Sequence, residues 1–210
     1  MGLKIVDSLS KVKQKINSVI ASTVNKKIQK NKAKAQKQIK SLIRGWIEQQ
    51  PVVISLKAQG QLGSLNAKFG LPPGVPDIAI ETIIGTLIES VDVIFKKMDS
   101  KGAGGIKFVI RGDVIRDILN IPQGTIVTKK GVPLNWLQWL LSRGNETVVS
   151  GYKSVPGSRG RSGGGTMMGG SSFRVEPARF AGTVDDNFVT RAFSNKDRQL
   201  SRILRELLKG

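Results

Sequence analysis

The chain contains no cysteine and no histidine. Without cysteine it forms no disulfide bonds and offers no thiolate ligands to a metal, and no oxidising compartment is indicated. Without histidine it lacks the usual general base and the commonest metal ligand. Ser–His and Cys–His nucleophilic sites are therefore excluded within this chain, and we expect no cofactor, no metal and no enzymatic activity.

Long apolar runs and a recognisable leader are also missing. No apolar run approaches the ~20 residues that a membrane-spanning helix needs. Residues 1–10 lack the basic, apolar and small-residue order of a secretory signal. We therefore expect synthesis in the cytoplasm and no membrane partner.

Positive charge is abundant. The 210 residues include 34 basic and 15 acidic residues, a formal net charge of +19, and 39% are hydrophobic, enough for a core of ordinary size. Residues 1–50 alone hold twelve basic and two acidic residues, whereas residues 51–100 are nearly neutral. Such a balance implies nucleic acid, an anionic membrane face or an acidic protein as the neighbour.

The basic N-terminal segment has a helical apolar period. The recurring positions are Leu9, Val12, Ile16, Val19 and Thr23, and then Ile39, Leu42, Ile43 and Trp46. This spacing predicts a long amphipathic helix that begins near Asp7 or Ser8 and is ended by Gly45 and then Pro51. The middle, residues 25–40, is rich in Lys, Gln and Ala, which predicts a solvated rod or, because like charges repel, a frayed basic arm.

The remaining pattern predicts an α+β fold, in which the long basic N-terminal helix and further helices pack on a small, mainly antiparallel sheet. We expect strands at 52–56, 106–111, 125–128, 147–155 and 171–175, and helices at 77–98, 113–119, 133–141 and 195–209. The predicted domains are a basic helix or arm at 1–50, a compact α+β domain at 51–195 with flexible loops at 60–76 and 156–170, and a C-terminal helix at 196–210.

Two motifs are candidate binding sites. The glycine-rich stretch at 162–170 lacks the Lys-Ser/Thr of a phosphate-binding loop, so a flexible loop is favoured, although Arg159 and Arg161 could touch a phosphate backbone or an acidic partner. Asp185 and Asp186 form an acid pair that could hold a divalent cation. A turn that caps a helix beginning near Asn187 is the favoured interpretation.

Trp136 and Trp139 allow two interpretations. With Lys129, Lys130 and Arg143 they could form a stacking surface for single-stranded nucleic acid. Because the two Trp residues accompany four Leu residues on one predicted helix, a core or subunit-interface position is favoured.

The lysines of the N-terminal helix are the candidate partner-facing residues, together with Arg159 and Arg161. They are Lys26, Lys27, Lys30, Lys32, Lys34 and Lys37. A membrane role is the weakest option, because residues 29–38 offer only Ala as apolar side chains on the helix. Binding of nucleic acid and docking on an acidic protein ring fit equally well, and a solvated face without a partner remains an alternative.

The C-terminal half resembles a known family. The stretches that carry the resemblance are residues 133–141, 148–152, 158–168, 173–177, 180–183 and 187–193. Their succession is similar to that of minor structural proteins at the head–tail junction of tailed bacteriophages, the tail-completion, neck or connector class. The resemblance covers roughly residues 75–195, and residues 187–193 depart from the commoner Pro-Phe-Leu-rich ending of that class.

The resemblance implies a non-enzymatic virion protein made in the host cytoplasm. Such a protein forms a homo-oligomeric ring, often six- or twelve-fold, between the portal–adaptor complex and the tail tube or tail terminator, with passing contact to genomic DNA. The alternative function is that of a sequence-nonspecific nucleic-acid-binding protein that contacts phosphates through the lysines of the N-terminal helix.

Overall fold

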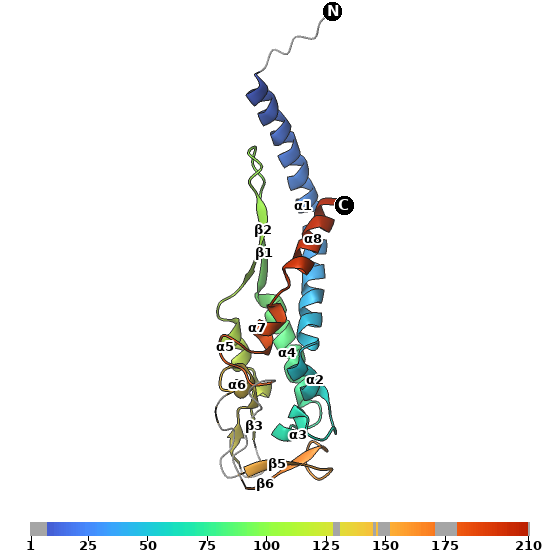
Figure 1. Cartoon of the computed structure of the whole chain (residues 1–210), viewed down its shortest axis with the longest axis vertical. Helices are drawn as coiled ribbons and strands as arrows, with labels where there is room; N and C mark the ends of the chain where they lie inside the picture. The colour runs from blue at the N-terminus through green and yellow to red at the C-terminus, as the bar shows by residue number, and fades with distance from the viewer. Residues whose placement is uncertain (1–7, 128–130, 145, 147–151, 171–179, 210) are drawn as a thin grey trace, which may run out of the picture. The chain divides into compact units, whose positions relative to one another are not determined.

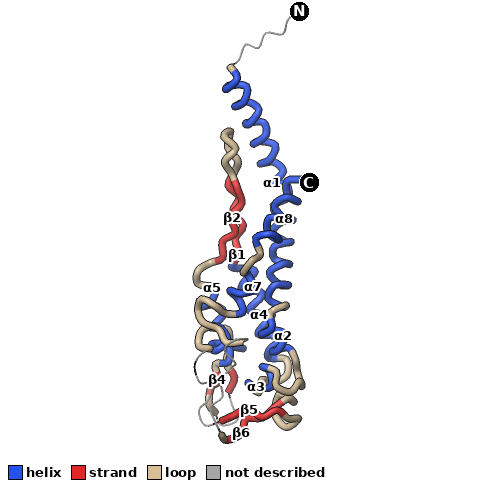
Figure 2. Tube along the Cα trace, viewed as in Figure 1, coloured by secondary structure: helices blue, strands red, loops and turns tan. Residues whose placement is uncertain are grey.

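The computed structural model describes residues 8–127, 131–144, 146, 152–170 and 180–209 (Figures 1 and 2). The helices are α1 (Leu9–Glu48), α2 (Pro51–Lys57), α3 (Leu65–Phe69), α4 (Val75–Ser90), α5 (Val114–Leu119), the 3-10 helix η1 (Pro122–Gly124), α6 (Trp136–Leu141), α7 (Phe188–Phe193) and α8 (Asp197–Lys209). The strands are β1 (Val91–Lys96), β2 (Gly105–Ile110), β3 (Ile126–Val127), β4 (Pro133–Leu134), β5 (Tyr152–Pro156) and β6 (Gly165–Gly169).

The α+β class and the long N-terminal helix are confirmed. Helix α1 has 40 residues and is therefore ~60 Å long. Its start is capped by Ser8, whose Oγ accepts a hydrogen bond from the Lys11 N–H at 3.4 Å, while Asp7 lies outside the described residues. The predicted stop at Gly45 is wrong: the helix runs through it to Glu48, because a helical glycine costs only about 1 kcal/mol and the neighbouring Trp46 is buried.

The chain divides into two compact units, each built from segments that are distant in the sequence. Among the described residues, unit 1 contains 8–41, 91–110 and 195–209, and unit 2 contains 42–90 and 111–194. Unit 1 therefore holds most of α1, the β1–β2 hairpin and α8. Its buried apolar side chains, among those described, are Ala21, Ala35, Ile39, Val93 and Ile203.

The β1–β2 hairpin corrects the predicted helix at 77–98. Helix α4 ends at Ser90, and β1 then pairs antiparallel with β2, with Val91 opposite Ile110 and Lys96 opposite Gly105. Apolar spacing alone extends the helix to residue 98, but residues 91–95 are mostly β-branched or aromatic and gain a partner strand. The Arg111 N–H donates to the Ser90 carbonyl at 3.1 Å, which closes the base of the hairpin. The predicted strand at 106–111 is confirmed as β2.

Unit 2 contains the larger core. Helix α4 buries Ile80, Ile83, Ile84 and Leu87, as its apolar spacing predicts. The predicted strand at 52–56 is wrong, because these residues form helix α2. Pro51 occupies the first helical position of α2, where its missing N–H costs nothing, and the helix buries Val52, Val53 and Leu56 at helical spacing.

Two segments predicted as loops contain regular structure. Within 60–76, Ser64 caps α3 by accepting the Ala67 N–H at 3.2 Å, and Gly70 ends it at φ 61°. Within 156–170, strand β6 pairs antiparallel with β5, with Pro156 opposite Gly165. Glycine at this turn lets the hairpin pack closely against the segment before α3. A Cβ on Gly164 would lie 2.8 Å from the Gln61 carbonyl oxygen.

The other short elements follow the predictions in part. The helices expected at 113–119, 133–141 and 195–209 occur as α5, α6 and α8, although Pro133–Leu134 forms strand β4 ahead of α6. The strand at 125–128 occurs as β3, paired with β4. Of the strand at 147–155, residues 152–155 belong to β5, whereas 147–151 and the predicted strand at 171–175 lie outside the described residues. Among the described residues the strands form three separate two-stranded antiparallel sheets.

Candidate interaction surface

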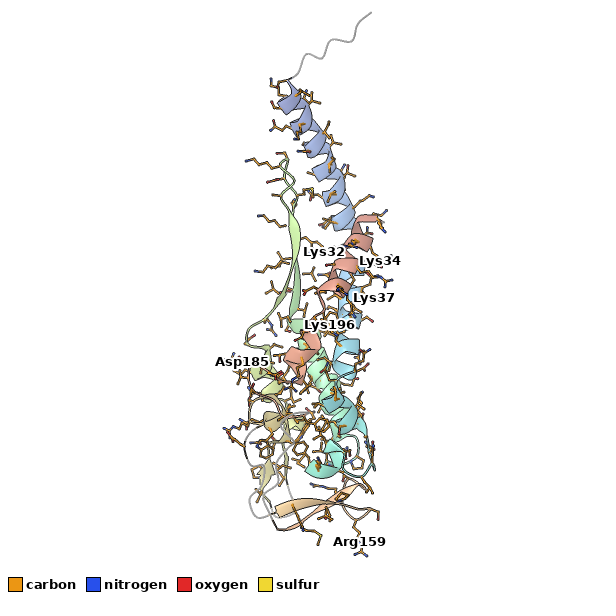
Figure 3. All side chains as sticks on the ribbon, viewed as in Figure 1. Lys32, Lys34, Lys37, Arg159, Asp185 and Lys196 are labelled. Carbon is orange, nitrogen blue, oxygen red and sulfur yellow. The ribbon has the colours of Figure 1, made fainter. Side chains whose placement is uncertain are left out.

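Four of the predicted partner-facing lysines share one exposed face of α1. Lys26, Lys30, Lys34 and Lys37 are separated by four, four and three residues, which places them on one side of a helix, and all four are exposed. No acidic residue occurs between Leu9 and Ile47. The result is an uninterrupted basic face, here called the lysine face, within unit 1. Lys34 and Lys37 are labelled in Figure 3.

Lys32 and Lys27 differ from the lysine face. Lys32 is half-buried, and its Nζ lies 5.5 Å from the centroid of the Phe95 ring of strand β1. This cation–π geometry attracts the ammonium group to the hairpin. Lys27 is also half-buried. The structure therefore separates four exposed lysines of the predicted set from two that are half-buried.

The two arginines of the predicted site lie in unit 2, and they differ from each other. Arg161 donates from Nε to the Gly70 carbonyl at 3.2 Å and from Nη1 to the Val127 carbonyl at 3.4 Å. It thereby joins the β5–β6 turn to α3 and β3. Arg159, two residues earlier, is exposed at the turn (Figure 3). The sequence could not separate them, because both sit in the same glycine-rich context.

The acid pair belongs to a helix start. Asn187 caps α7: its Oδ1 accepts the N–H groups of Val189 and Thr190 at 3.0 and 3.1 Å. Asp186 forms a two-point ion pair with Arg191, with Oδ1 2.6 Å from Nε and Oδ2 2.8 Å from Nη2. This hydrogen bonding lowers the pKa of the Asp186 carboxyl group, although burial opposes the shift. The favoured interpretation, a turn before a helix at Asn187, is confirmed.

Trp136 belongs to the core of unit 2, and the half-buried Trp139 lies at its edge. Trp136 is fully buried, and its indole N–H donates to the Gln123 carbonyl at 2.9 Å. Trp139 stacks on Phe69 with a centroid distance of 6.3 Å and an interplanar angle of 6°. These contacts are the core position that the sequence favoured, with Phe69 supplied by a helix that the sequence did not predict.

A groove of about 1010 Å³ lies between α1 and strand β1 within unit 1. It is lined by α1 residues between Ser18 and Lys32 and by residues 93–98. Asn25 bounds it by donating from Nδ2 to the Met98 carbonyl at 2.9 Å and accepting the Met98 N–H at 2.8 Å. Sequence reasoning missed this feature, because it placed residues 91–98 in a helix. The β-branched run before the Lys101–Gly105 turn is the signal that could have found it.

The N-terminal part of α1 carries an exposed apolar row on the same side of the helix as the lysine face. Leu9, Val12, Ile16, Val19 and Thr23, here called the α1 stripe, follow steps of three, four, three and four residues. Leu9 is 87% exposed, Ile16 53% and Val19 66%. Val12 is half-buried, and Thr23 ends the row. Several large exposed apolar side chains in one row are typical of an interaction surface.

Two types of site find no support among the described residues. No group of three acidic side chains in the described part of the chain lies close enough to hold a metal ion. None of the described helices has the length and apolarity that crossing a membrane requires. In the described part of the chain, the lysine face and the α1 stripe are two candidate contact surfaces on α1.

Comparison with protein-family models, curated proteins and solved structures finds no significant match to the chain.

Proposed function

We propose that the chain is a structural, non-enzymatic subunit of the head–tail junction of a tailed bacteriophage, a neck, connector or tail-completion protein in a homo-oligomeric ring that joins the portal–adaptor complex to the tail. The observation that carries the proposal is the surface of α1. This helix presents ten lysines and one arginine and reaches its only acidic residue at Glu48. The type of assembly is taken from the resemblance of residues 75–195 to proteins of the head–tail junction.

The proposed mechanism is packing rather than chemistry. Subunits of a closed ring contact neighbours on both sides. A long exposed helix supplies a large contact area for few residues. Acidic groups on neighbouring subunits would complement the lysine face. That attraction orients the subunits during assembly and is screened by salt.

The single arginine of α1 illustrates such a contact inside the chain. Arg44, in unit 2, donates from Nη1 to Glu81 Oε1 of α4 at 2.8 Å and to Glu48 Oε1 at 3.4 Å. The hydrogen bond from Arg44 lowers the pKa of the Glu81 carboxyl group. At this position the chain itself supplies the acids that pair with α1.

Quantitative mass spectrometry of density-purified particles tests the proposal. We expect peptides of this chain at about six to twelve copies per particle, the stoichiometry of one closed ring. Electron microscopy of the purified protein mixed with its particle neighbours should show closed rings. Absence of the chain from intact particles would contradict the proposal.

A second candidate, sequence-nonspecific nucleic-acid binding, is favoured by the lysine face specifically. Lys26 to Lys37 spans eleven residue steps, ~16 Å of helix, a length over which several phosphates of a duplex are within reach. If these lysines contact phosphates, log affinity falls with log salt with a slope of about −0.9 per contact.

A matched charge change separates the two candidates. The first variant changes Lys26, Lys30, Lys34 and Lys37 to Gln. The control changes Lys57, Lys97, Lys101 and Lys107, four other exposed lysines, to Gln, so that the net charge falls equally. Tight, salt-steep DNA binding that only the first variant abolishes would favour the nucleic-acid function. Loss of particle assembly with weak DNA binding throughout favours the junction subunit.

A further inference from the structure

The α1 stripe is set apart from the side chains that α1 buries within unit 1. Ala21, Ala35 and Ile39 are 4%, 0% and 2% exposed and lie on one side of the helix. At 100° per residue, the centre of the α1 stripe lies roughly 150° around the helix from that side. The elements that cover the buried side therefore leave the α1 stripe uncovered.

The spacing of the stripe specifies the shape of what covers it. Steps of three, four, three and four residues average 3.5, the repeat of the a and d positions in a coiled coil. Leu9, Ile16 and Thr23 take one of these positions and Val12 and Val19 the other. Side chains at such positions insert between those of a facing helix. The complement of the α1 stripe is therefore an amphipathic helix of about two heptads.

Charge specifies the chemistry of that helix. With Leu9 at position a, Lys13 falls at e, one of the positions that flank a coiled-coil seam and meet the partner's charges. Between Leu9 and Ile47 the helix has no acid. A second copy of α1 would bring the same excess of lysines and no acid to offset them. A helix with Glu or Asp beside its apolar row brings the opposite charge.

We infer that the α1 stripe is the docking site for an acidic amphipathic helix of a different protein. The helix packs along Leu9–Thr23, with its apolar row against the stripe and a carboxylate beside Lys13. The inference deepens the proposed function and rests on it in one respect: the acidic helix would belong to a neighbouring protein of the head–tail junction.

A designed peptide serves as the probe. It is a three-heptad helix with Leu and Ile at a and d and Glu at e and g, and its binding to the full chain is measured by calorimetry. A peptide of the same composition in scrambled order controls for charge alone. We expect the heptad peptide to bind, the scrambled peptide to bind at least about tenfold more weakly, and the affinity to fall as salt is raised.

Two variants localise the binding. Changing both Ile16 and Val19 to Ser removes apolar area from the stripe and should lower the affinity for the heptad peptide by at least about tenfold. Ile78→Ser controls for the Ile16 half of this change, because Ile78 is an isoleucine on helix α4 that is 55% exposed, compared with 53% for Ile16. It should leave the affinity unchanged. Circular dichroism confirms that both variants are folded.

Three results would overturn the inference. One is equal binding of the heptad and scrambled peptides. A second is self-association of the chain in analytical ultracentrifugation that the Ile16/Val19 variant abolishes, which would assign the stripe to a second copy. A third is stripe-dependent binding to phosphatidylserine vesicles without peptide binding, which would assign it to a lipid surface. Peptide binding and copy number in particles are separate measurements, so failure of one is distinguishable from failure of the other.

Discussion

Asn25 and Met98 are joined by two hydrogen bonds, because the Asn25 amide group donates to the Met98 carbonyl at 2.9 Å and accepts the Met98 N–H at 2.8 Å. One side chain thus satisfies both backbone polar groups of a residue that follows strand β1. The pairing imitates that of a neighbouring strand, and it fixes the hairpin to α1 within unit 1.

Asn25→Ala should destabilise the protein by about 1–2 kcal/mol, since two partly buried hydrogen bonds are lost together. Urea unfolding measures the change, and amide hydrogen exchange should show faster exchange at Met98. Asn25→Asp keeps the acceptor and loses the donor, so Met98 should remain protected in that variant. Equal exchange at Met98 in wild type and Asn25→Ala would show that the pairing does not form in solution.

Gly45→Ala should stabilise the protein by roughly 0.5–1 kcal/mol, because Ala has a higher helix propensity and Gly45 lies inside α1. A Cβ at this position would meet no atom within 4 Å. Gly182→Ala is the control of opposite sign, since its Cβ would overlap the Leu140 carbonyl oxygen, and it should destabilise by about 3 kcal/mol. The midpoints of urea unfolding report both. A destabilised Gly45→Ala variant would argue that α1 breaks at this residue.

The Asp186–Arg191 pair should make stability depend on pH in the acid range. Arg191 lowers the pKa of Asp186 in the folded state, so the stabilisation is present above the ordinary carboxyl range near pH 4. It is lost as the pH falls through the lowered folded-state pKa. Asp186→Asn and Arg191→Gln should each reduce stability at neutral pH, and their difference from wild type should shrink as the solution is acidified. A difference that stays constant down to pH 2 would contradict this assignment.

Arg161→Ala should loosen the β5–β6 turn, whereas Arg159→Ala should not. Arg161 donates to two backbone carbonyls, and its removal should cost about 1 kcal/mol and speed proteolysis between residues 157 and 164. Arg159 is exposed at the same turn and carries the same charge, so it serves as the matched control. Limited proteolysis followed by mass spectrometry compares the two. Equal cleavage of both variants would show that the Arg161 contacts do not order the turn.

Local patterns predicted those elements whose signals agree with one another. Helix α1 has apolar spacing, good helix formers and a Ser8 cap, and its start and type follow from them, although its end was wrongly placed at Gly45. The capping of α7 by Asn187 could likewise be predicted from the sequence, because Asn is a preferred residue at the N-cap position of a helix.

Elements with conflicting local signals could not be predicted from short windows, because contacts with distant residues decide their structure. Residues 91–95 have both the apolar spacing of a helix and the β-branched composition of a strand, and pairing with β2 decides between them. Residues 52–56 form a helix because α3 and α4 cover Val52, Val53 and Leu56, contacts that no short window contains.

The candidate surface was predicted in outline. The sequence marked the lysines of α1, but exposure separates Lys26, Lys30, Lys34 and Lys37 from Lys32, which lies over Phe95. That distinction requires the hairpin, which the sequence did not predict. The α1 stripe was visible as a periodic pattern, yet only the structure shows that Leu9, Ile16 and Val19 are exposed.

The scarcity of acids in α1 has a consequence for its behaviour at different ionic strengths. Lys26 and Lys30, and Lys30 and Lys34, are like charges one turn apart, and each such pair opposes helix formation by a few tenths of a kcal/mol. Added salt weakens this repulsion, so it stabilises α1, whereas it destabilises a helix built on ion pairs. The same salt weakens attraction to an acidic partner. Helical order and release from the partner therefore increase together.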